Sequence, residues 1–195
     1  QIHKLLSAQS LPDSHLIYLW GPDNVGISHL SQAACHHWQN MNLSCQYLPL
    51  QELAEVDGAA LLDGLEFQDL VCVENLQNIA GNTQWENALF NFYNRINDQQ
   101  NLLLVTANCP PNALTLKLPD LVSRLSSGLV FHLPTYVDED KTAILKFRAS
   151  RLGLDMTDEV AAYLLNRYSR KLDDLLVIPN RLDVASLEAK RRVTI

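Results

Sequence analysis

The sequence predicts an α/β protein: a parallel sheet with flanking helices, followed by a small helical domain. Short apolar runs alternate with longer amphipathic segments, which is the pattern of a parallel sheet covered by crossover helices. After Pro134 the sequence shows only helical periodicity. Apolar residues make up 47% of the chain and charged residues 19%, as in a packed globular protein. We therefore place an α/β base over residues 1–135 and a helical domain over residues 136–195.

The elements of the base follow from short runs rich in Leu, Val, Ile or aromatic residues, which indicate strands buried on both faces. The predicted strands are residues 16–20, 45–50, 70–73, 102–106 and 129–133. Residues 28–40 and 84–98 carry apolar side chains at helical spacing and should pack onto the sheet.

The second domain should contain helices at residues 138–152, 158–168 and 171–190. Gly153 is expected to end the first of these helices, and Thr157 to start the second. Pro179 lacks an N–H and clashes with the preceding turn, so the third should kink or restart near Asn180.

The charge and the apolar runs exclude two classes of partner. The formal net charge is -7 and the pI about 5.2, which opposes binding to phosphate backbones. Direct DNA binding should therefore be small. No apolar run reaches the roughly 18 residues of a membrane span. We expect a soluble, cytoplasmic protein.

The cysteines and histidines give no ligand pattern. Cysteines 35, 45, 72 and 109 form no CxxC motif and should be reduced, buried thiols. His29, Cys35, His36 and His37 share one predicted helix, but adjacent histidines there point about 100° apart and no carboxylate stands at ligand spacing. No metal site is expected.

Residues 21–28 (GPDNVGIS) join a predicted strand to a predicted helix with the spacing of a phosphate-binding loop. Backbone N–H groups at the helix start would cradle phosphate, and the Ser28 hydroxyl could reach Mg²⁺. Ile27 replaces the lysine that would neutralise the β and γ phosphates, so diphosphate binding should survive better than hydrolysis. The alternative is an ordinary strand-to-helix turn. The candidate nucleotide-binding residues are Pro22, Asn24, Val25, Gly26, Ile27, Ser28 and His29.

Two further strands end in polar residues. Glu74 ends the run LVCVE, as a Walker B acid does when it faces hydrated magnesium. Asn75 follows where such ATPases often carry the water-activating carboxylate, and an amide cannot act as that base. Asn108 follows the fourth predicted strand, where a sensor of the γ phosphate would stand. The alternative for each is a strand with a polar end.

In this order the motifs resemble the AAA+ proteins, and among them the DnaA-like clade with its DnaA-homologous regulators of replication initiation. The resemblance runs from Ile17 to Ile195 in the blocks IYLWGPDNVGISHLSQAAC, YLPL, LVCVENLQNIAGNTQWENALFNFYNRI, PDLVSRLSSG and DEDKTAILKFRASRLG. It implies an AAA+ P-loop base with a helical lid. In three places the chain departs from the pattern: Ile27 lacks the basic residue, Glu74 stands where aspartate is usual, and Pro179 interrupts the lid.

The resemblance implies roles for two arginines. Arg124, in SRLSSG, is implied to be an arginine finger offered in trans to ATP held by a neighbouring AAA+ subunit. Arg170 is implied to be the sensor 2 arginine that touches the bound nucleotide. Without the resemblance, Arg124 would be interpreted as a surface arginine paired with Asp120, and Arg170 as a solvated charge at a helix end.

The resemblance therefore implies a negative regulator of replication initiation. It would bind ADP or another nucleoside diphosphate, with Mg²⁺ where a metal is needed, and would promote hydrolysis of DnaA-bound ATP through Arg124 while hydrolysing none itself. Its implied partners are DnaA and the sliding clamp, and a homodimer through the same face stays open. The clamp-binding QLxLP-type peptide should lie upstream of Gln1, because the similar QYLPL at residues 46–50 is a predicted strand. Two alternatives are an AAA+ ATPase acting as a loader or remodeller and a nucleotide-free adaptor.

Overall fold

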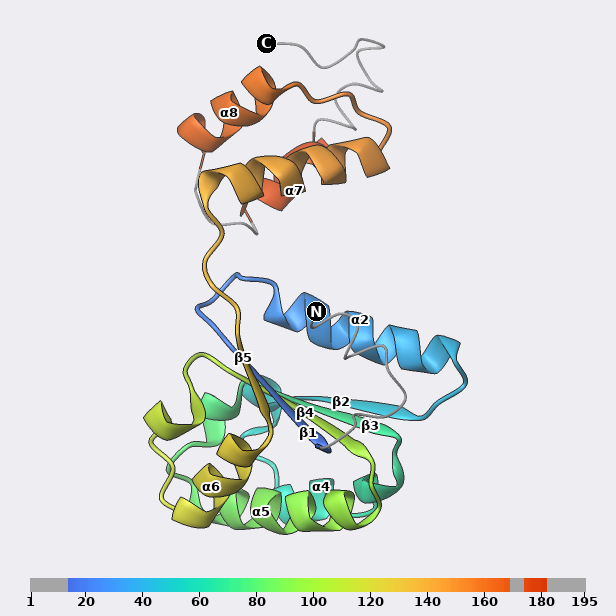
Figure 1. Ribbon diagram of the computed structural model, residues 1–195, viewed down its shortest axis with the longest axis vertical. Helices are drawn as coiled ribbons and strands as arrows, with labels where there is room; N and C mark the ends of the chain where they lie inside the picture. Colours follow the sequence, from blue (N-terminus) through green and yellow to red (C-terminus); the bar gives the residue numbers. More distant parts are fainter. Residues whose placement is uncertain (1–13, 169–173, 182–195) are drawn as a thin grey trace. The chain divides into compact units, whose positions relative to one another are not determined.

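The computed structural model describes residues 14–168 and 174–181. The chain divides into two compact units, Gln1–Pro134 and Thr135–Ile195 (Figure 1). The boundary predicted from the sequence lies after residue 135. The first unit contains the sheet, and the described residues of the second form helices and their connections, so the two units are described separately below.

Five parallel strands form one sheet in the order β2-β3-β4-β1-β5. The strands are β1 (Leu16–Trp20), β2 (Cys45–Pro49), β3 (Leu70–Glu74), β4 (Leu102–Ala107) and β5 (Leu129–His132). All five predicted strands are confirmed, each to within one residue at either end. The prediction that all of them are buried on both faces is wrong for β2 and β5, because these two strands form the edges of the sheet and keep partly exposed residues.

Helices cover both faces of the sheet. Helix α2 (Ile27–Asn40) lies on one face, whereas α5 (Thr83–Asp98) and α6 (Pro119–Ser127) lie on the other (Figure 1). The core beneath α5 and α6 includes Tyr18, Trp85 and Phe92, all of them almost fully buried. Short connecting turns were not predicted from the sequence: α3 (Leu50–Leu53), α4 (Gly58–Leu61), η1 (Leu65–Phe67), η2 (Leu76–Ile79) and η3 (Pro111–Ala113).

The strand order creates a switch point between β1 and β4. From β1 the chain passes through α2 to β2 at one edge of the sheet, whereas from β4 it passes through α6 to β5 at the opposite edge. The connections leave these two neighbouring strands in opposite directions. Open α/β sheets bind their ligands in the crevice at the carboxyl ends of such strands. The predicted phosphate loop follows β1, so it lies at this position.

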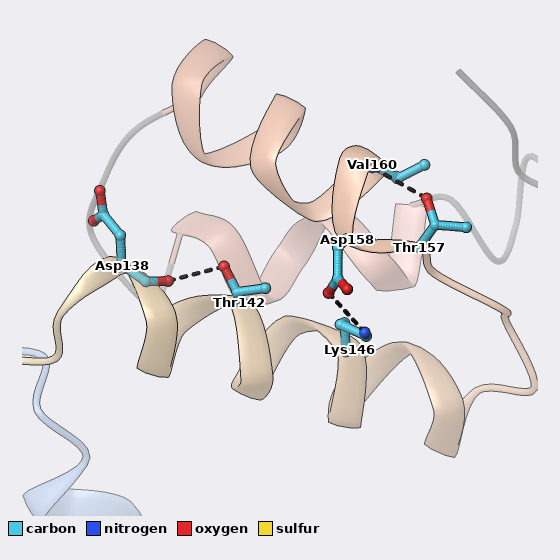
Figure 2. A network of polar contacts seen from close by, with 6 residues as sticks. All are labelled: Asp138, Thr142, Lys146, Thr157, Asp158 and Val160. Atoms are coloured by element: carbon cyan, nitrogen blue, oxygen red, sulfur yellow. Dashed lines mark hydrogen bonds and ion pairs between the residues drawn. The ribbon is translucent and has the colours of Figure 1, made fainter.

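The second unit packs α7 (Asp138–Arg151), α8 (Asp158–Arg167) and the helical residues 174–181 around one apolar core. The Thr157 hydroxyl accepts the Val160 N–H at 3.4 Å, and Lys146 Nζ lies 2.7 Å from Asp158 Oδ1 (Figure 2). Gly153 follows α7 with a φ of 76°. The predicted helix start at Thr157 and helix stop at Gly153 are therefore confirmed.

Pro179 does not interrupt the helix before Arg181. Residues 174–181 are helical throughout, so the restart predicted near Asn180 is wrong for the part of this helix that the structure describes. Helical backbone continues through the proline even though proline cannot donate the hydrogen bond of its turn.

Candidate functional site

The loop at residues 21–28 turns sharply into α2. Asn24 and Gly26 adopt positive φ angles of 65° and 85°, and Gly26 is the N-cap residue of α2. Gly26 has no side chain to cap the helix, and the first turn of α2 contains no acidic residue. The first N–H groups of a helix lack intrahelical acceptors and carry the positive end of the dipole. The loop therefore presents a helix start that suits an anion.

The start of the loop is fixed between β4 and the segment that follows β5. The Gly21 N–H donates to the Ala107 carbonyl at 3.3 Å. A Cβ at Gly21 would lie only 2.4 Å from the Leu133 carbonyl oxygen, so glycine is required for this close approach. The Trp20 and His132 rings stack with centroids 3.9 Å apart at the ends of β1 and β5. The loop thus starts from a rigid base.

The side chains of the loop supply little charge. Pro22, Asn24, Ser28 and His29 are exposed or partly exposed, Val25 is buried, and Gly26 and Ile27 are partly buried. No lysine or arginine occurs in the sequence between Lys4 and Arg95. The missing cation at position 27 is therefore part of a long segment without lysine or arginine, which can be found in the sequence alone. The loop offers backbone N–H groups and the Ser28 hydroxyl, but no cation of its own.

Glu74 is the last residue of β3 and is 3% exposed. Side chains alternate along a strand, so Glu74 shares a face with Cys72, whose Sγ lies 3.4 Å from Cys35 Sγ on α2. Within the described part of the chain, Glu74 Oε1 has no hydrogen-bond partner. A buried carboxylate oxygen without a donor is costly, and a hydrated Mg²⁺ at this edge would satisfy it. The residue fits the predicted Walker B position.

The carboxyl ends of β3 and β4 are joined by hydrogen bonds around Asn75. The Asn75 N–H donates to Thr106 Oγ1 at 3.1 Å, and Gln77 Nε2 donates to Asn75 Oδ1 at 3.3 Å. The Asn108 N–H donates to Gln77 Oε1 at 3.3 Å. Asn108 is exposed and lies just after β4, at the switch point. Asn75 thus serves as a structural link at the position where related ATPases carry a base.

The Tyr18 hydroxyl donates to the Cys109 carbonyl at 2.9 Å. This bond holds the segment after β4 against β1. Burial raises the pKa of Tyr18 well above its ordinary value, so the hydroxyl remains a donor at neutral pH. Asn108 is therefore anchored on both sides.

Arg124 lies on α6, in the layer opposite to α2 (Figure 1). It is exposed, and its guanidinium carbon lies 5.7 Å from the centre of the Tyr93 ring on α5. Among the described residues it forms no ion pair, so the alternative prediction of a pair with Asp120 is wrong. The structure does not bring Arg124 to residues 21–28, and the second predicted arginine, Arg170, lies outside the described residues.

Glu86 fixes the start of α6 and was not predicted as a functional residue. Its carboxylate is fully buried and accepts the backbone N–H groups of Gly81 at 2.7 Å and of Lys117 and Leu118 at 2.8 Å each. Leu118 is the N-cap residue of α6. Glu86 is therefore a positioning residue for the helix that carries Arg124. Lys117 and Leu118 lie 31 and 32 positions from Glu86, so no local pattern reveals these two contacts.

The fold also brings three of the four cysteines together. The sulfur atoms of Cys35, Cys45 and Cys72 all lie within 4.8 Å of one another. All four cysteines are free, as predicted, but only Cys35 and Cys72 are buried, whereas Cys45 and Cys109 are partly exposed. Hydrogen bonds from the neighbouring thiols lower the pKa of Cys35, and the same contacts together with burial raise the pKa of Cys72.

The fold is shared with solved structures of replication initiators. Domain III of DnaA from Thermotoga maritima matches with a TM-score of 0.80 at 21% identity, over 99% of this chain and 85% of that chain. AMPPCP-bound DnaA from Aquifex aeolicus matches at 0.79 and 19%, over 97% of this chain and 62% of that one. A RuvB structure from Thermotoga maritima matches at 0.69 and 21%, over 93% and 58%. The predicted AAA+ fold of the DnaA type is confirmed.

The lid defines the relationship more closely. A family model described as "Hda, lid domain" matches residues 138–195. Residues 138–195 are thus similar to the lid domain of Hda, and the predicted resemblance to Hda-like regulators is confirmed. The chain covers 62% of the length of the first DnaA structures that it matches. No helix in the described part of the chain is long and apolar enough to cross a membrane.

Proposed function

We propose that this protein is a negative regulator of replication initiation that docks on DnaA and promotes hydrolysis of DnaA-bound ATP through Arg124. The Hda-type lid on a DnaA-like AAA+ fold supports the class of function. One observation carries the finer proposal: Arg124 is exposed on a well-braced helix, in the layer opposite to the chain's own phosphate loop. A guanidinium so placed is available to a nucleotide on another molecule.

The chemistry at DnaA would be charge stabilisation. A guanidinium offered in trans spreads positive charge over the transferring phosphoryl group and is worth about 10³ to 10⁵ in rate. Tyr93 lies beneath the guanidinium and restricts its orientation, and Glu86 holds the N-terminus of α6. The full rate enhancement requires that the Arg124 side chain is already oriented. A disordered arginine would lose its rotamer freedom in the transition state, and this entropy cost would lower the rate.

The chain's own nucleotide is proposed to be a regulatory ligand, either ADP or another nucleoside diphosphate. The N–H groups of residues 24–29 would contact the phosphates, and Ser28 and Glu74 would hold the water shell of Mg²⁺. Bound Mg²⁺ would neutralise phosphate charge that no lysine neutralises. Asn75 cannot activate water, so we expect no hydrolysis by this chain. We further propose the sliding clamp as a second partner, which the family resemblance implies.

The decisive experiment measures turnover of DnaA-bound ATP with the full-length protein and clamp loaded on DNA. Replacing Arg124 with alanine should remove the stimulation, a loss of about 10³ if the finger supplies its usual share. Arg148, an exposed arginine on lid helix α7, provides the matched control, and Arg148→Ala should stimulate like the parent. Equal stimulation by Arg124→Ala and the parent would show that another group acts on the phosphate.

A nucleotide-free adaptor is the second candidate, favoured by the absence of lysine and arginine between Lys4 and Arg95. In this case residues 21–28 survive as scaffold and Arg124 still acts on DnaA. Calorimetric titration with ADP and Mg²⁺ separates the two, since a complete lack of binding heat at several temperatures selects the adaptor. A phosphate-release assay on the isolated chain tests the ATPase alternative, which predicts magnesium-dependent turnover that Glu74→Ala abolishes.

A further inference from the structure

Three thiols from three different elements converge between α2 and the sheet. Cys35 comes from α2, Cys45 from the start of β2, and Cys72 from the middle of β3. Their sulfur atoms lie within 4.8 Å of one another, and the Cys35 and Cys72 sulfurs are 3.4 Å apart. The fourth cysteine, Cys109, is not part of this group. The cluster is separate from the phosphate loop and Arg124, and the proposed function uses none of its members.

The strand register explains the convergence. Cys45 pairs with Leu70 and Tyr47 pairs with Cys72, so the two cysteines are diagonal neighbours on parallel strands. Residues two apart on a strand share a face, which places both side chains on the side of the sheet that α2 covers. Cys35 occupies the buried face of α2 directly opposite. The arrangement is therefore built by the fold itself and does not depend on a flexible loop.

The surroundings of the cluster suit a bound ion with one accessible side. Cys72 is 0% and Cys35 7% exposed, whereas Cys45 is partly exposed on edge strand β2. An ion could therefore enter past Cys45 and be held by two sulfurs in the core. Within the described residues no histidine, aspartate or glutamate joins the three sulfurs as a ligand. Hard cations such as Mg²⁺ and Ca²⁺ need oxygen ligands and are excluded.

We propose that Cys35, Cys45 and Cys72 together bind one thiophilic d¹⁰ cation, Zn²⁺ or Cu⁺. Sulfur ligands select these soft ions. Tetrahedral zinc with Zn–S bonds of about 2.3 Å separates its sulfurs by about 3.8 Å, so small side-chain shifts within the observed spread of 3.4 to 4.8 Å suffice. Three thiols give up their protons to the buffer as the ion binds. Water at the Cys45 side completes four-coordination for Zn²⁺, and Cu⁺ needs only the three sulfurs.

This assignment departs from the sequence-based expectation of no metal site. That expectation rested on ligands spaced along one helix, whereas these three cysteines lie on a helix and two strands. A bound ion would tie α2 to β2 and β3. Residues 21–28 lead directly into α2, so the ion would also stiffen the support of the phosphate loop. The site is a stabilising one in this proposal and carries out no reaction.

Titration of the reduced full chain with Co²⁺, a spectroscopic substitute for Zn²⁺, tests the proposal. We expect one ion per chain and thiolate-to-cobalt charge-transfer absorption, which Zn²⁺ then displaces. A parallel titration with Cu⁺ against a Cu⁺-specific chelator decides between the two ions. Cys45→Ser should abolish the charge-transfer band while retaining the circular dichroism of the parent, because Cys45 is partly exposed and the change is nearly isosteric.

Two control variants identify the ligands. Cys109→Ser removes the thiol outside the cluster, and His36→Gln with His37→Gln removes the exposed imidazoles beside Cys35. Both should bind the ion like the parent. Alkylation provides a readout in the unaltered protein: Zn²⁺ should protect Cys45 from iodoacetamide and leave Cys109 reactive. The proposal is overturned if the parent shows no thiolate-to-metal absorption with Co²⁺ and no complex with Cu⁺, or if the histidine variant alone loses the ion.

Discussion

The phosphate loop and the helix that carries Arg124 differ in charge: the loop has no cation, whereas the helix presents one. Residues 21–28 have the backbone of a phosphate cradle, held by Gly21 and opening into an uncapped helix, but no cation. The chain has 15 lysines and arginines, and all of them except Lys4 occur from Arg95 onward. Arg124 is exposed, its guanidinium carbon lies 5.7 Å from the centre of the Tyr93 ring, and its helix is anchored at Glu86. In the proposed function the cation therefore stands on the exposed side of α6 and not in the loop.

The lysine of a phosphate loop and an arginine finger contribute free energies of different size. A charged hydrogen bond to phosphate contributes about 1.5–3 kcal/mol, so its loss weakens binding without removing a cradle of backbone N–H groups. A finger in trans supplies about 4–7 kcal/mol of transition-state stabilisation, the equivalent of 10³ to 10⁵ in rate. A protein that regulates hydrolysis on a partner can therefore lose the first interaction and must keep the second. The following predictions test each side of this contrast.

The largest of these three effects is expected at Glu86, whose carboxylate anchors the start of α6. Glu86→Ala leaves three backbone N–H groups without their acceptor, and we expect the free energy of unfolding to fall by about 3–4 kcal/mol. Urea denaturation followed by circular dichroism measures this loss. Gln84→Ala, at an exposed position of the same helix, should change stability little. A loss below about 1 kcal/mol for Glu86→Ala would mean that water replaces the carboxylate and that α6 is not anchored there.

Much of the fold could be predicted because its signals are local. Each strand is one short apolar run, and the helix ends at Thr157 and Gly153 depend on capping chemistry within a few residues. Helix α6 was not predicted as a helix, because PDLVSRLSS is only nine residues long and shows little more than two turns of periodicity. Burial of the edge strands was overestimated, since sheet order is not encoded in any single strand.

The candidate site divides in the same way. The loop, Glu74 and Asn108 were predicted from motifs that occupy adjacent positions in the sequence. Glu86 and the three cysteines were not, because the contacts from Glu86 to Lys117 and from Cys35 to Cys72 join residues 31 and 37 positions apart. The alternative interpretation paired Arg124 with Asp120, four residues away on the same helix, whereas the packing of α5 against α6 supplies Tyr93. Sequence spacing favoured the local pair, and tertiary packing decided against it.

The second effect in size tests the loop directly. Ile27→Lys restores a cation at the phosphate position, and we expect the free energy of binding ADP with Mg²⁺ to become more favourable by about 1.5–3 kcal/mol, which raises the affinity about 10- to 150-fold. Isothermal titration calorimetry measures the change. Ile27→Met keeps the apolar character of this partly buried residue and should bind like the parent. If Ile27→Lys binds no better than Ile27→Met, the loop does not contact phosphate and the adaptor function is favoured.

The smallest effect concerns how Tyr93 orders Arg124. A cation–π contact on a partly exposed ring contributes about 0.5–1 kcal/mol, so Tyr93→Leu should lower stimulation of DnaA-bound ATP turnover by about 2- to 5-fold. Tyr93→Phe keeps the ring and should stimulate like the parent. Both variants should unfold at nearly the parent's urea concentration, which separates orientation of Arg124 from loss of fold. Equal stimulation by the Tyr93→Leu and Tyr93→Phe variants would mean that contact with DnaA orients Arg124. Of the two contacts, only the one between Glu86 and the start of α6 would then help to position the arginine.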